Sequence, residues 1–459
     1  MKRWFLWLVL FGSVVASAQV PTTASRFGIV EGFWFPEMTC DLGVGWERII
    51  FDWSQHQPEK PDDWYTLNVD DRWIKAASQC NREVVALLKN TPAWATDGQP
   101  GPGVPKNLHL PVDDPDNYWA AFVRKTVEYY TSRGVYHYII WNEPDIDRET
   151  YGHEFSGDLE DYFLLLKVAY LSARSVNPAV VIHLAGTTYW HDVNAGRRPY
   201  YERLFERIQQ DPDALANNHY FDVLSLHLYF RTQAVADILQ EMRALLARYN
   251  LQKTVWINEM NAAPTIDPDW PVVRPQYPLD LDQQAAFIVQ AAALALAYDV
   301  ERMAVYKLYD QQLPAGGESF GITSPVNAAP RPAYYAWRYI AHSWANVTDA
   351  SHAQTTTLDA VRLAHEAGQE TLVMWAREDQ PVQVSVGAAG SKAYLVDHLG
   401  GMQVIYPSQG RYTLLLPPAR CNASDGCFIG GEPWIIIQPQ SGGSLFEETH
   451  NQRVEIRFN

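Results

Sequence analysis

The sequence predicts an α/β protein: a (β/α)8 TIM barrel followed by a small antiparallel β-sandwich domain. Two observations support this prediction. Eight short apolar, β-branched runs alternate with helix-like stretches between residues 26 and 345. After Trp344 the helical period stops, and closely spaced strand candidates separated by turn residues replace it. Alternating strands and helices favour a parallel sheet, and eight such units are the number that closes a barrel.

The expected barrel strands are runs that each end in polar or aromatic residues. In chain order they are Phe27–Glu31, Arg48–Phe51, Val84–Leu88, Tyr136–Trp141, Val180–Leu184, Val223–His227, Thr254–Ile257 and Met303–Leu308. The helices between them show apolar residues at helical spacing; they are expected at Tyr118–Arg133, Leu159–Val176, Ala234–Tyr249, Gln283–Tyr298 and Ala333–Trp344. An open doubly wound sheet is the alternative, but no GxGxxG follows the first strand.

The sandwich is expected over residues 346–438. Its strand candidates are Val361–Ala364, Thr371–Trp375, Val382–Val386, Ala393–Val396, Met402–Ile405, Tyr412–Leu416 and Trp434–Ile437. None of this region shows a helical period, which is typical of an all-β domain. Residues 439–459 begin with a Ser- and Gly-rich stretch, so we expect a linker or a loose tail there.

Residues 1–18 are typical of a signal peptide. Lys2 and Arg3 precede the apolar run Trp4–Val15, and Ala16-Ser17-Ala18 fits a cleavage site. The protein is therefore expected to be secreted or periplasmic. The run is short for a membrane span, and no second long apolar run follows, so no span is expected.

The charge and aromatic composition limits the classes of binding partner that the protein is expected to have. Acidic residues outnumber basic ones, 53 against 36, for a net charge of −17. Nucleic acids and anionic membranes attract clustered Lys and Arg, so neither is an expected partner. The aromatic content of 13% indicates either a large core or a surface that stacks on apolar faces. The sequence gives no oligomeric state.

Four cysteines permit three disulfide pairings in an exported protein. Sequence proximity favours Cys421 with Cys427, which leaves Cys40 with Cys80. Neither a CxxC nor an HExxH motif is present, so no metal and no cofactor are expected.

Two carboxylates stand where barrels carry their chemistry, at the carboxyl ends of strands. Glu143 ends the fourth predicted strand region, and Glu259 ends the seventh. A pair of carboxylates is the minimum set for cleaving a glycosidic bond. Strands spaced about 4.8 Å apart in an eight-stranded barrel place these two carboxyl groups roughly 5–6 Å apart. That separation is close to the 5–5.5 Å of retaining enzymes and below that of inverting ones.

Several motifs resemble the clan A glycoside hydrolases, the retaining (β/α)8 superfamily, and in particular family 39 and its relatives. The resemblance covers residues 26–345. The matching segments are Trp141-Asn142-Glu143-Pro144, Trp256-Ile257-Asn258-Glu259, Thr91-Pro92-Ala93-Trp94, Gly45-Trp46-Glu47-Arg48, Asp52-Trp53-Ser54 and His227-Leu228-Tyr229. The resemblance implies a retaining glycoside hydrolase that acts on a poly- or oligosaccharide by double displacement, and the signal peptide implies that it is secreted. Glu259 is then the nucleophile, and Glu143 is the acid and then the base.

Further residues are expected to bind substrate or to tune the carboxylates. By resemblance, Asn142 bonds the sugar 2-hydroxyl, and His227 bonds substrate or orients a carboxylate. Arg48 and Tyr229 are expected to keep Glu259 ionised. Glu31 is expected to contact sugar hydroxyls or to pair with Arg48.

Aromatic residues after the strands are candidates for stacking on a sugar ring, which presents an apolar C–H face. They are Trp53, Trp94, Trp190 and Trp270. Many clan A members carry a Trp at the end of the eighth strand; here Tyr309 is the expected substitute. The alternative function is a non-catalytic carbohydrate-binding or adhesion protein on a decayed barrel. The presence of both Glu143 and Glu259 argues against decay, while endo and exo action fit the sequence equally well.

Overall fold

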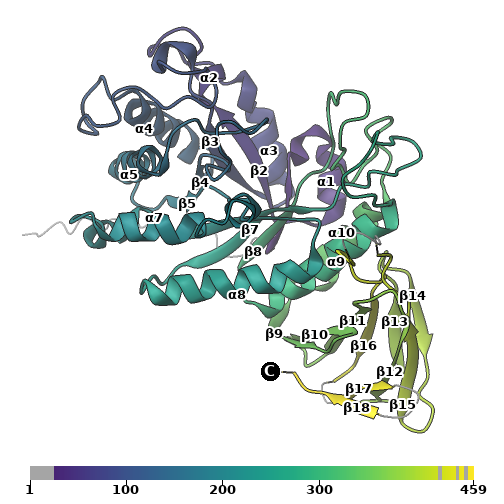
Figure 1. Ribbon diagram of the computed structural model, residues 1–459. Helices are drawn as coiled ribbons and strands as arrows, with labels where there is room; N and C mark the ends of the chain where they lie inside the picture. The colour runs from purple at the N-terminus through teal and green to yellow at the C-terminus, as the bar shows by residue number, and fades with distance from the viewer. Residues whose placement is uncertain (1–24, 422–425, 441–443, 449–452, 459) are drawn as a thin grey trace, which may run out of the picture.

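The computed structural model describes residues 25–421, 426–440, 444–448 and 453–458. Eight parallel strands close into a barrel in chain order, which confirms the predicted fold class (Figure 1). The strands are β1 (Phe27–Val30), β2 (Trp46–Asp52), β3 (Glu83–Lys89), β4 (His137–Ile140), β5 (Val181–Leu184), β6 (Val223–Tyr229), β7 (Thr254–Asn261) and β8 (Arg302–Val305).

Ten α-helices lie in the described part of the chain, all before the sandwich. They are α1 (Pro36–Leu42), α2 (Trp53–His56), α3 (Asp71–Gln79), α4 (Tyr118–Thr131), α5 (Leu159–Val176), α6 (Trp190–Asn194), α7 (Tyr200–Gln209), α8 (Thr232–Arg248), α9 (Leu281–Ala297) and α10 (Pro332–Ser343). Short 3-10 helices occupy Gly32–Trp34, Leu67–Val69, Ala93–Ala95 and Leu215–Tyr220. Capping boxes start α5 at Asp158 and α9 at Asp280, where each side chain accepts a backbone N–H of the first turn.

The barrel interior is filled by side chains, as expected for eight strands. This interior cluster comprises Val30, Trp46, Val85, Leu87, Ile139, Val223, Trp256 and Ala304. Because side chains alternate between the two faces of a strand, the next inward positions on β2 and β3 belong to Arg48 and Lys89, and the inward face of β6 continues from Val223 through Ser225 and His227 to Tyr229. The packed interior therefore leads directly to polar groups at the carboxyl ends of the strands.

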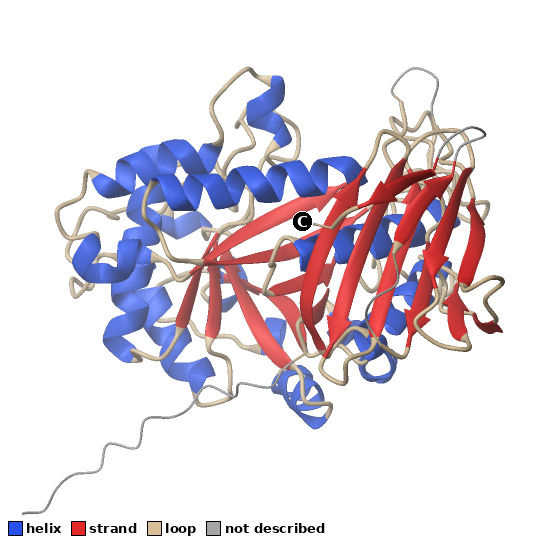
Figure 2. Cartoon of the chain, turned by 90° about the horizontal axis from the view of Figure 1, so that it is seen from below, coloured by secondary structure: helices blue, strands red, loops and turns tan. Residues whose placement is uncertain are grey.

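The sandwich consists of two antiparallel sheets, with strand orders β14-β13-β16-β11-β10-β9 and β15-β12-β17-β18. Figure 2 shows its long strands lying side by side. The strands are β9 (Val347–Gln354), β10 (Leu358–His365), β11 (Glu370–Ala376), β12 (Val382–Gly387), β13 (Ala393–Val396), β14 (Met402–Ile405), β15 (Arg411–Leu416), β16 (Trp434–Gln438), β17 (Leu445–Glu448) and β18 (Arg453–Ile456).

The sandwich packs tightly on the barrel. Strands β9, β10 and β11 contact α9, and Val361, Val373 and Trp375 belong to the same apolar cluster as the barrel helices. A second cluster, which includes Val384 and Ile436, fills the space between the two sheets. The larger sheet is therefore buried on both faces at β11, whose seven residues are all buried.

The predicted loose tail at residues 439–459 is wrong for the part that the structure describes. Strand β17 pairs with β12, and β18 pairs with β17. Leu445 and Ile456 are buried between the sheets. Each strand has only four residues, too few to produce a clear alternation next to a Ser- and Gly-rich stretch. The predicted signal peptide, residues 1–18, lies outside the described residues.

Both disulfides favoured by the sequence are present. Cys40 at the end of α1 pairs with Cys80 after α3, with Cα atoms 5.7 Å apart. Cys421 pairs with Cys427, with Cα atoms 4.2 Å apart. Among the described helices, none combines the length and the apolar composition needed to cross a bilayer.

Candidate active site

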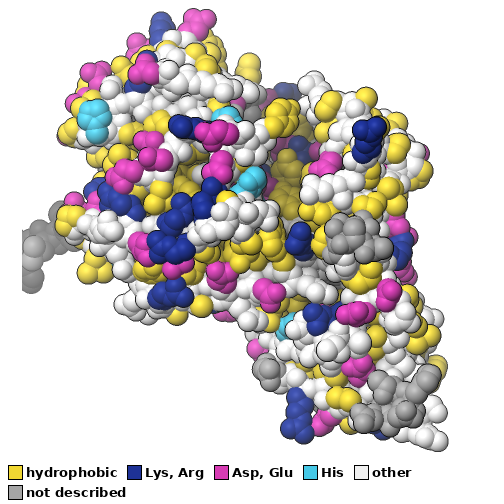
Figure 3. Space-filling view, viewed as in Figure 1, with side chains coloured by type: hydrophobic (Ala, Val, Ile, Leu, Met, Phe, Trp, Pro, Cys, Tyr) yellow, Lys and Arg dark blue, Asp and Glu magenta, His cyan; other side chains and the backbone are white. Residues whose placement is uncertain are grey.

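A cleft of about 510 Å³ lies at the carboxyl ends of the barrel strands. The face in Figure 3 is hollowed between the loops at the upper right and the rest of the barrel. The cleft is lined by Glu31, Arg48, Ile50, Leu87, Lys89, Asn142, Glu143, Glu154, His191, Tyr229, Phe230, Glu259, Tyr306, Glu318 and Phe320. Both predicted catalytic carboxylates therefore share one cavity.

A β-bulge aims Glu259 into this cleft. Trp256 points into the barrel, so strict alternation would turn Glu259 outward, to the side on which Ile257 joins the outer core. The ladder between β6 and β7 changes register at this point: Leu226 faces Ile257, but His227 faces Glu259. Asn258 is the extra residue. Bulges re-aim side chains in this way and are common beside active sites.

Two left-handed residues place Glu143. Strand β4 ends at Ile140, and the next residues include Trp141 at φ 72° and Glu143 at φ 41°. The Trp141 indole packs outward against Trp119 and donates to the carbonyl of Glu154 at 2.7 Å. This break in the alternation turns Asn142 and Glu143 toward the cleft. Non-glycine residues in this region are uncommon and often mark functional positions.

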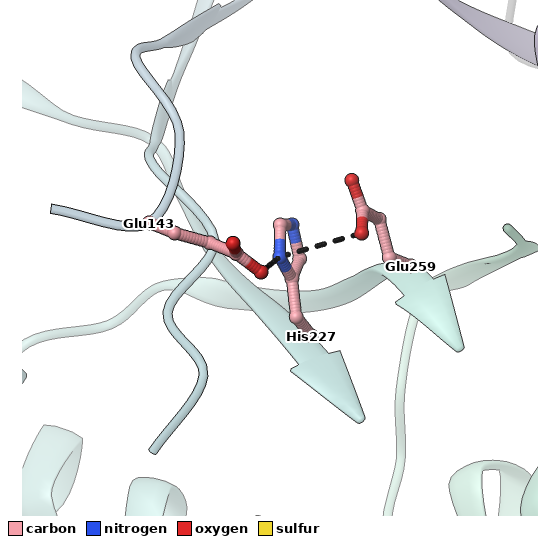
Figure 4. A group of neighbouring side chains, drawn as sticks. All are labelled: Glu143, His227 and Glu259. Carbon is pink, nitrogen blue, oxygen red and sulfur yellow. Dashed lines mark hydrogen bonds and ion pairs between the residues drawn. The ribbon is translucent and has the colours of Figure 1, made fainter. Parts of the chain in front are cut away.

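His227 lies between the two carboxylates (Figure 4). Its Nδ1 is 2.6 Å from Oε1 of Glu143 and 3.5 Å from Oε2 of Glu259. One oxygen of each carboxylate and a ring nitrogen all lie within 4.8 Å of one another. Gly186 makes room for the ring, because a Cβ there would lie 2.2 Å from Nε2 of His227. The carbonyl of Gly186 also accepts the backbone N–H of Glu143 at 3.0 Å.

Glu259 is held in its ionised form. Nη1 of Arg48 lies 2.5 Å from Oε1 of Glu259, and the Tyr229 hydroxyl donates to Oε2. Burial by itself raises the pKa of Glu259, but Arg48, then His227, and the Tyr229 hydroxyl outweigh it, so the pKa lies below its ordinary value. Both residues expected to keep Glu259 ionised are therefore in contact with it.

His227 responds to both carboxylates. Burial lowers its pKa, yet the charge of Glu259 and the hydrogen bond and charge of Glu143 outweigh that effect, so the pKa is raised. Its Nδ1 is within hydrogen-bond distance of Glu143, while Glu259 lies farther away at 3.5 Å. The ring is thus placed to orient Glu143, one of the two roles expected for it.

Two lysine–carboxylate pairs flank these residues. Nζ of Lys89 bonds Glu154, and Nζ of Lys307 lies 2.5 Å from Oε2 of Glu31. Burial, together with the nearby charge of Arg48, lowers the pKa of Lys89 to about 8. The expected pairing of Glu31 with Arg48 is wrong, because the guanidinium of Arg48 forms its ion pair with Glu259. Sequence reasoning missed Lys89 as a site residue, although the alternation of Val85 and Leu87 on β3 predicts its inward direction.

The predicted stacking aromatics are mostly elsewhere. Trp53 is completely buried and stacks on Phe122 with ring centroids 5.2 Å apart, so it presents no face to a sugar. Trp94 packs edge-on against Trp53 and donates to the carbonyl of Gln57. Neither lines the cleft, because the short helices that follow β2 and β3 turn both indoles toward α4.

Aromatic residues other than the predicted ones line the cleft. Tyr309 packs edge-on against Phe35, 5.1 Å away, and does not line the cleft. Tyr306, Phe230 and Phe320 line it instead. Trp190 and Trp270 are also absent from its lining; Trp190 borders a neighbouring cavity, and Trp270 donates to the carbonyl of Gly317. The sequence identified the correct strand end on β8 but not the correct tyrosine.

The group Glu143, His227 and Glu259 has the residue types of a metal site. The guanidinium of Arg48 already supplies the positive charge beside Glu259. A divalent cation at the same carboxylate would face that guanidinium at close range, so the surroundings favour acid–base chemistry over metal binding.

No protein-family model and no curated protein matches the chain. Solved structures do match. A family 39 glycoside hydrolase from the gut symbiont Bacteroides cellulosilyticus WH2 has a TM-score of 0.68 at 14% identity, covering 90% of this chain and 81% of that one. A GH39 β-xylosidase from Caulobacter crescentus has a TM-score of 0.59 at 14% identity, covering 91% and 98%. A GH30 endoxylanase from Clostridium papyrosolvens C71 has a TM-score of 0.57 at 13% identity, covering 91% and 97%. The chain shares the fold of these proteins, over both the barrel and the sandwich.

Proposed function

We propose that this protein is a secreted retaining glycoside hydrolase that cleaves O-glycosidic bonds of a poly- or oligosaccharide. The observation that carries the proposal is the pair Glu143 and Glu259 in one cleft, with carboxylate oxygens within 4.8 Å of each other. Retaining enzymes hold their two carboxyl groups about 5–5.5 Å apart, whereas inverting enzymes need about 6.5–9.5 Å to admit a water molecule.

The two carboxylates have unequal surroundings, which assigns their roles. Glu259 is buried and ionised by Arg48 and Tyr229, as a nucleophile must be. Glu143 is more exposed, and its side chain contacts His227 rather than a fixed cation. In the first step Glu259 attacks the anomeric carbon while Glu143 protonates the leaving oxygen. A glycosyl ester on Glu259 results.

The second step releases the sugar. Water attacks the anomeric carbon, Glu143 takes a proton from it, and Glu259 leaves as the carboxylate. Arg48 and Tyr229 stabilise that carboxylate as it forms. Oδ1 of Asn142 is buried without a partner among the described residues and lines the cleft, so it has capacity to bond a sugar hydroxyl.

The names of the structural neighbours guide the first substrates. Two are a β-xylosidase and an endoxylanase. Xylan, xylo-oligosaccharides and aryl xylosides are therefore the first probes, followed by the corresponding glucosides. The mixed charges of the cleft lining, with donors on Arg48 and Lys89 and acceptors on Glu31 and Glu154, suit a hydroxyl-rich neutral sugar.

The test replaces each carboxylate. Glu259→Ala is expected to lower kcat by about a thousandfold or more, and Glu143→Ala to do the same on substrates with poor leaving groups. Azide should restore turnover of Glu143→Ala on activated aryl glycosides and give a glycosyl azide of retained configuration. Glu259→Ala should give the inverted azide. Glu318→Gln changes another carboxylate of the same cleft and is expected to cost less than about tenfold.

Binding and turnover measurements on the wild-type protein distinguish the proposed hydrolase from the alternative function, a non-catalytic binding or adhesion protein. Wild-type protein that binds these sugars by calorimetry but releases no product on prolonged incubation would establish the alternative. Wild-type turnover retained by both alanine variants would remove the assignment of Glu143 and Glu259. The anomeric configuration of the first product, followed by NMR, decides between retention and inversion.

A further inference from the structure

A second cavity of about 440 Å³ lies where the barrel meets the sandwich. The barrel contributes Trp190, Arg231 and Asp237, and the sandwich segments contribute Glu378 and Phe428. None of these residues lines the catalytic cleft. Volumes of this size are typical of small-molecule sites.

This cavity adjoins the catalytic cleft. Trp190 borders the cavity, and the next residue, His191, lines the cleft. Likewise Arg231 borders the cavity, and Phe230 lines the cleft. The two spaces therefore meet along the same stretch of backbone at both places.

Aromatic rings connect the same two spaces. Phe230 of the cleft packs on Tyr277 with ring centroids 5.0 Å apart, and Tyr277 packs on Phe428 of the second cavity at 5.1 Å. These packed rings form an apolar path from the catalytic cleft to the second cavity. A sugar chain that extends out of the cleft can follow this path.

The second cavity is preorganised for polar ligands. The guanidinium of Arg231 lies between the rings of Trp190 and Phe428, 4.6 Å from each centroid. A guanidinium stacked in this way is fixed in direction while its N–H donors stay available in its plane. Within the described ranges, that guanidinium makes no hydrogen bond or ion pair, and neither do the side chains of Gln233 and Glu378. Donors, acceptors and a flat indole together match the chemistry of a pyranose.

We propose that this cavity is a distal subsite, which binds a further sugar unit of the same chain that the catalytic cleft cleaves. The proposal rests on the proposed function and extends it: the substrate is an oligo- or polysaccharide longer than the cleft, and the sandwich helps to bind it. Trp190 then contacts sugar, as the sequence indicated, but away from the reacting bond.

The test measures kcat/KM against chain length. With xylo-oligosaccharides from dimer to hexamer, and with the cello-oligosaccharide series, the wild type is expected to gain about tenfold or more when a unit reaches the cavity, equivalent to about 1.4 kcal/mol. Arg231→Leu and Trp190→Ala are expected to lose most of this gain, yet to keep kcat/KM on a short aryl glycoside within about twofold. Gln233→Ala, which breaks no stacking contact, is expected to lose part of the gain.

Tyr406→Ala is the matched control, because Tyr406 is an exposed aromatic of the sandwich that borders neither cavity. It should leave both measurements unchanged. If the gain with chain length survives Arg231→Leu, Trp190→Ala and Gln233→Ala, the distal subsite is wrong while the hydrolase assignment stands. If the wild type cleaves no glycoside, the proposed function itself fails. A thermal melt of each variant identifies a loss that comes from unfolding, and Gln233→Ala then decides.

Discussion

At the scale of single residues, cationic side chains lie close to the two carboxylates, Glu143 and Glu259. Arg48 and Glu259 form a buried pair, and removing one member of such a pair typically costs 3–5 kcal/mol, because an unpaired charge remains. His227 hydrogen-bonds Glu143 and lies 3.5 Å from Glu259. Lys89, the next inward residue after Leu87 on β3, is a further cation beside Arg48 and His227. It loses its charge as the pH rises through about 8.

Lys89 gives a testable pH dependence. Its pKa of about 8 means that the ammonium loses its proton as the pH rises through 8, and its charged bond to Glu154 weakens. We expect kcat/KM of the wild type to fall on this basic limb. Lys89→Met, which keeps the length without the charge, should lose about tenfold at pH 7 and lack this limb. Lys60→Met, an exposed lysine, is the control.

The same residue predicts a stability change with a definite sign. The pKa of Lys89 is lower in the folded protein than in the unfolded chain, where it is about 10.4. Between about pH 8 and 10 the unfolded chain therefore binds more protons, and the free energy of unfolding should rise with pH. Denaturant unfolding of the wild type against Lys89→Met isolates this slope. A basic limb and a slope that both persist in Lys89→Met would show that another group titrates.

At the scale of elements, the β7 bulge decides which way Glu259, the proposed nucleophile, points. Deleting Asn258 makes β7 a regular strand in which Glu259 directly follows the outward Ile257 and still lies opposite His227, so Glu259 should keep facing the cleft and a folded deletion variant should stay active, within about a hundredfold of the wild type. Asn258→Ala keeps the bulge length and should stay within about tenfold of the wild type. Turnover of an aryl glycoside, with circular dichroism to verify folding, provides the comparison. A folded deletion variant with no detectable activity would contradict this account of the bulge.

Elements also show where sequence reasoning succeeds. The eight barrel strands are predictable, because buried parallel strands appear as continuous apolar runs. The extension of β7 to Asn261 is not, since Asn258, Glu259 and Asn261 are polar and a bulge depends on the partner strand. The direction of Trp53 depends on the turn into α2. The partner of Glu31 is Lys307, which only the closure of β1 against β8 brings near.

At the scale of the whole molecule, α9 joins the two domains. Nearly every residue of this helix is buried, as expected for a helix with no solvent face. One side packs toward the barrel, and β9, β10 and β11 cover another. Gln290 in its middle bonds Thr232 of the barrel side and the carbonyl of Gly431 on the sandwich side. The sandwich is therefore part of the structural support of the barrel, and its position beside the proposed distal subsite follows from this contact.

Strands β17 and β18, near the end of the chain, also contribute to the stability of the sandwich. Leu445 on β17 is completely buried between the two sheets. Leu445→Ala is therefore expected to lower the free energy of unfolding by about 2–5 kcal/mol, the usual cost of truncating a core leucine. Val454→Ala on β18 changes a side chain that is 44% exposed and should cost less than about 0.5 kcal/mol. A chain ending at Gln438 should lose at least as much stability as Leu445→Ala, because β12 loses its partner β17. Chemical denaturation of the three proteins measures this, and a chain ending at Gln438 with wild-type stability would show that β17 and β18 contribute nothing to the fold.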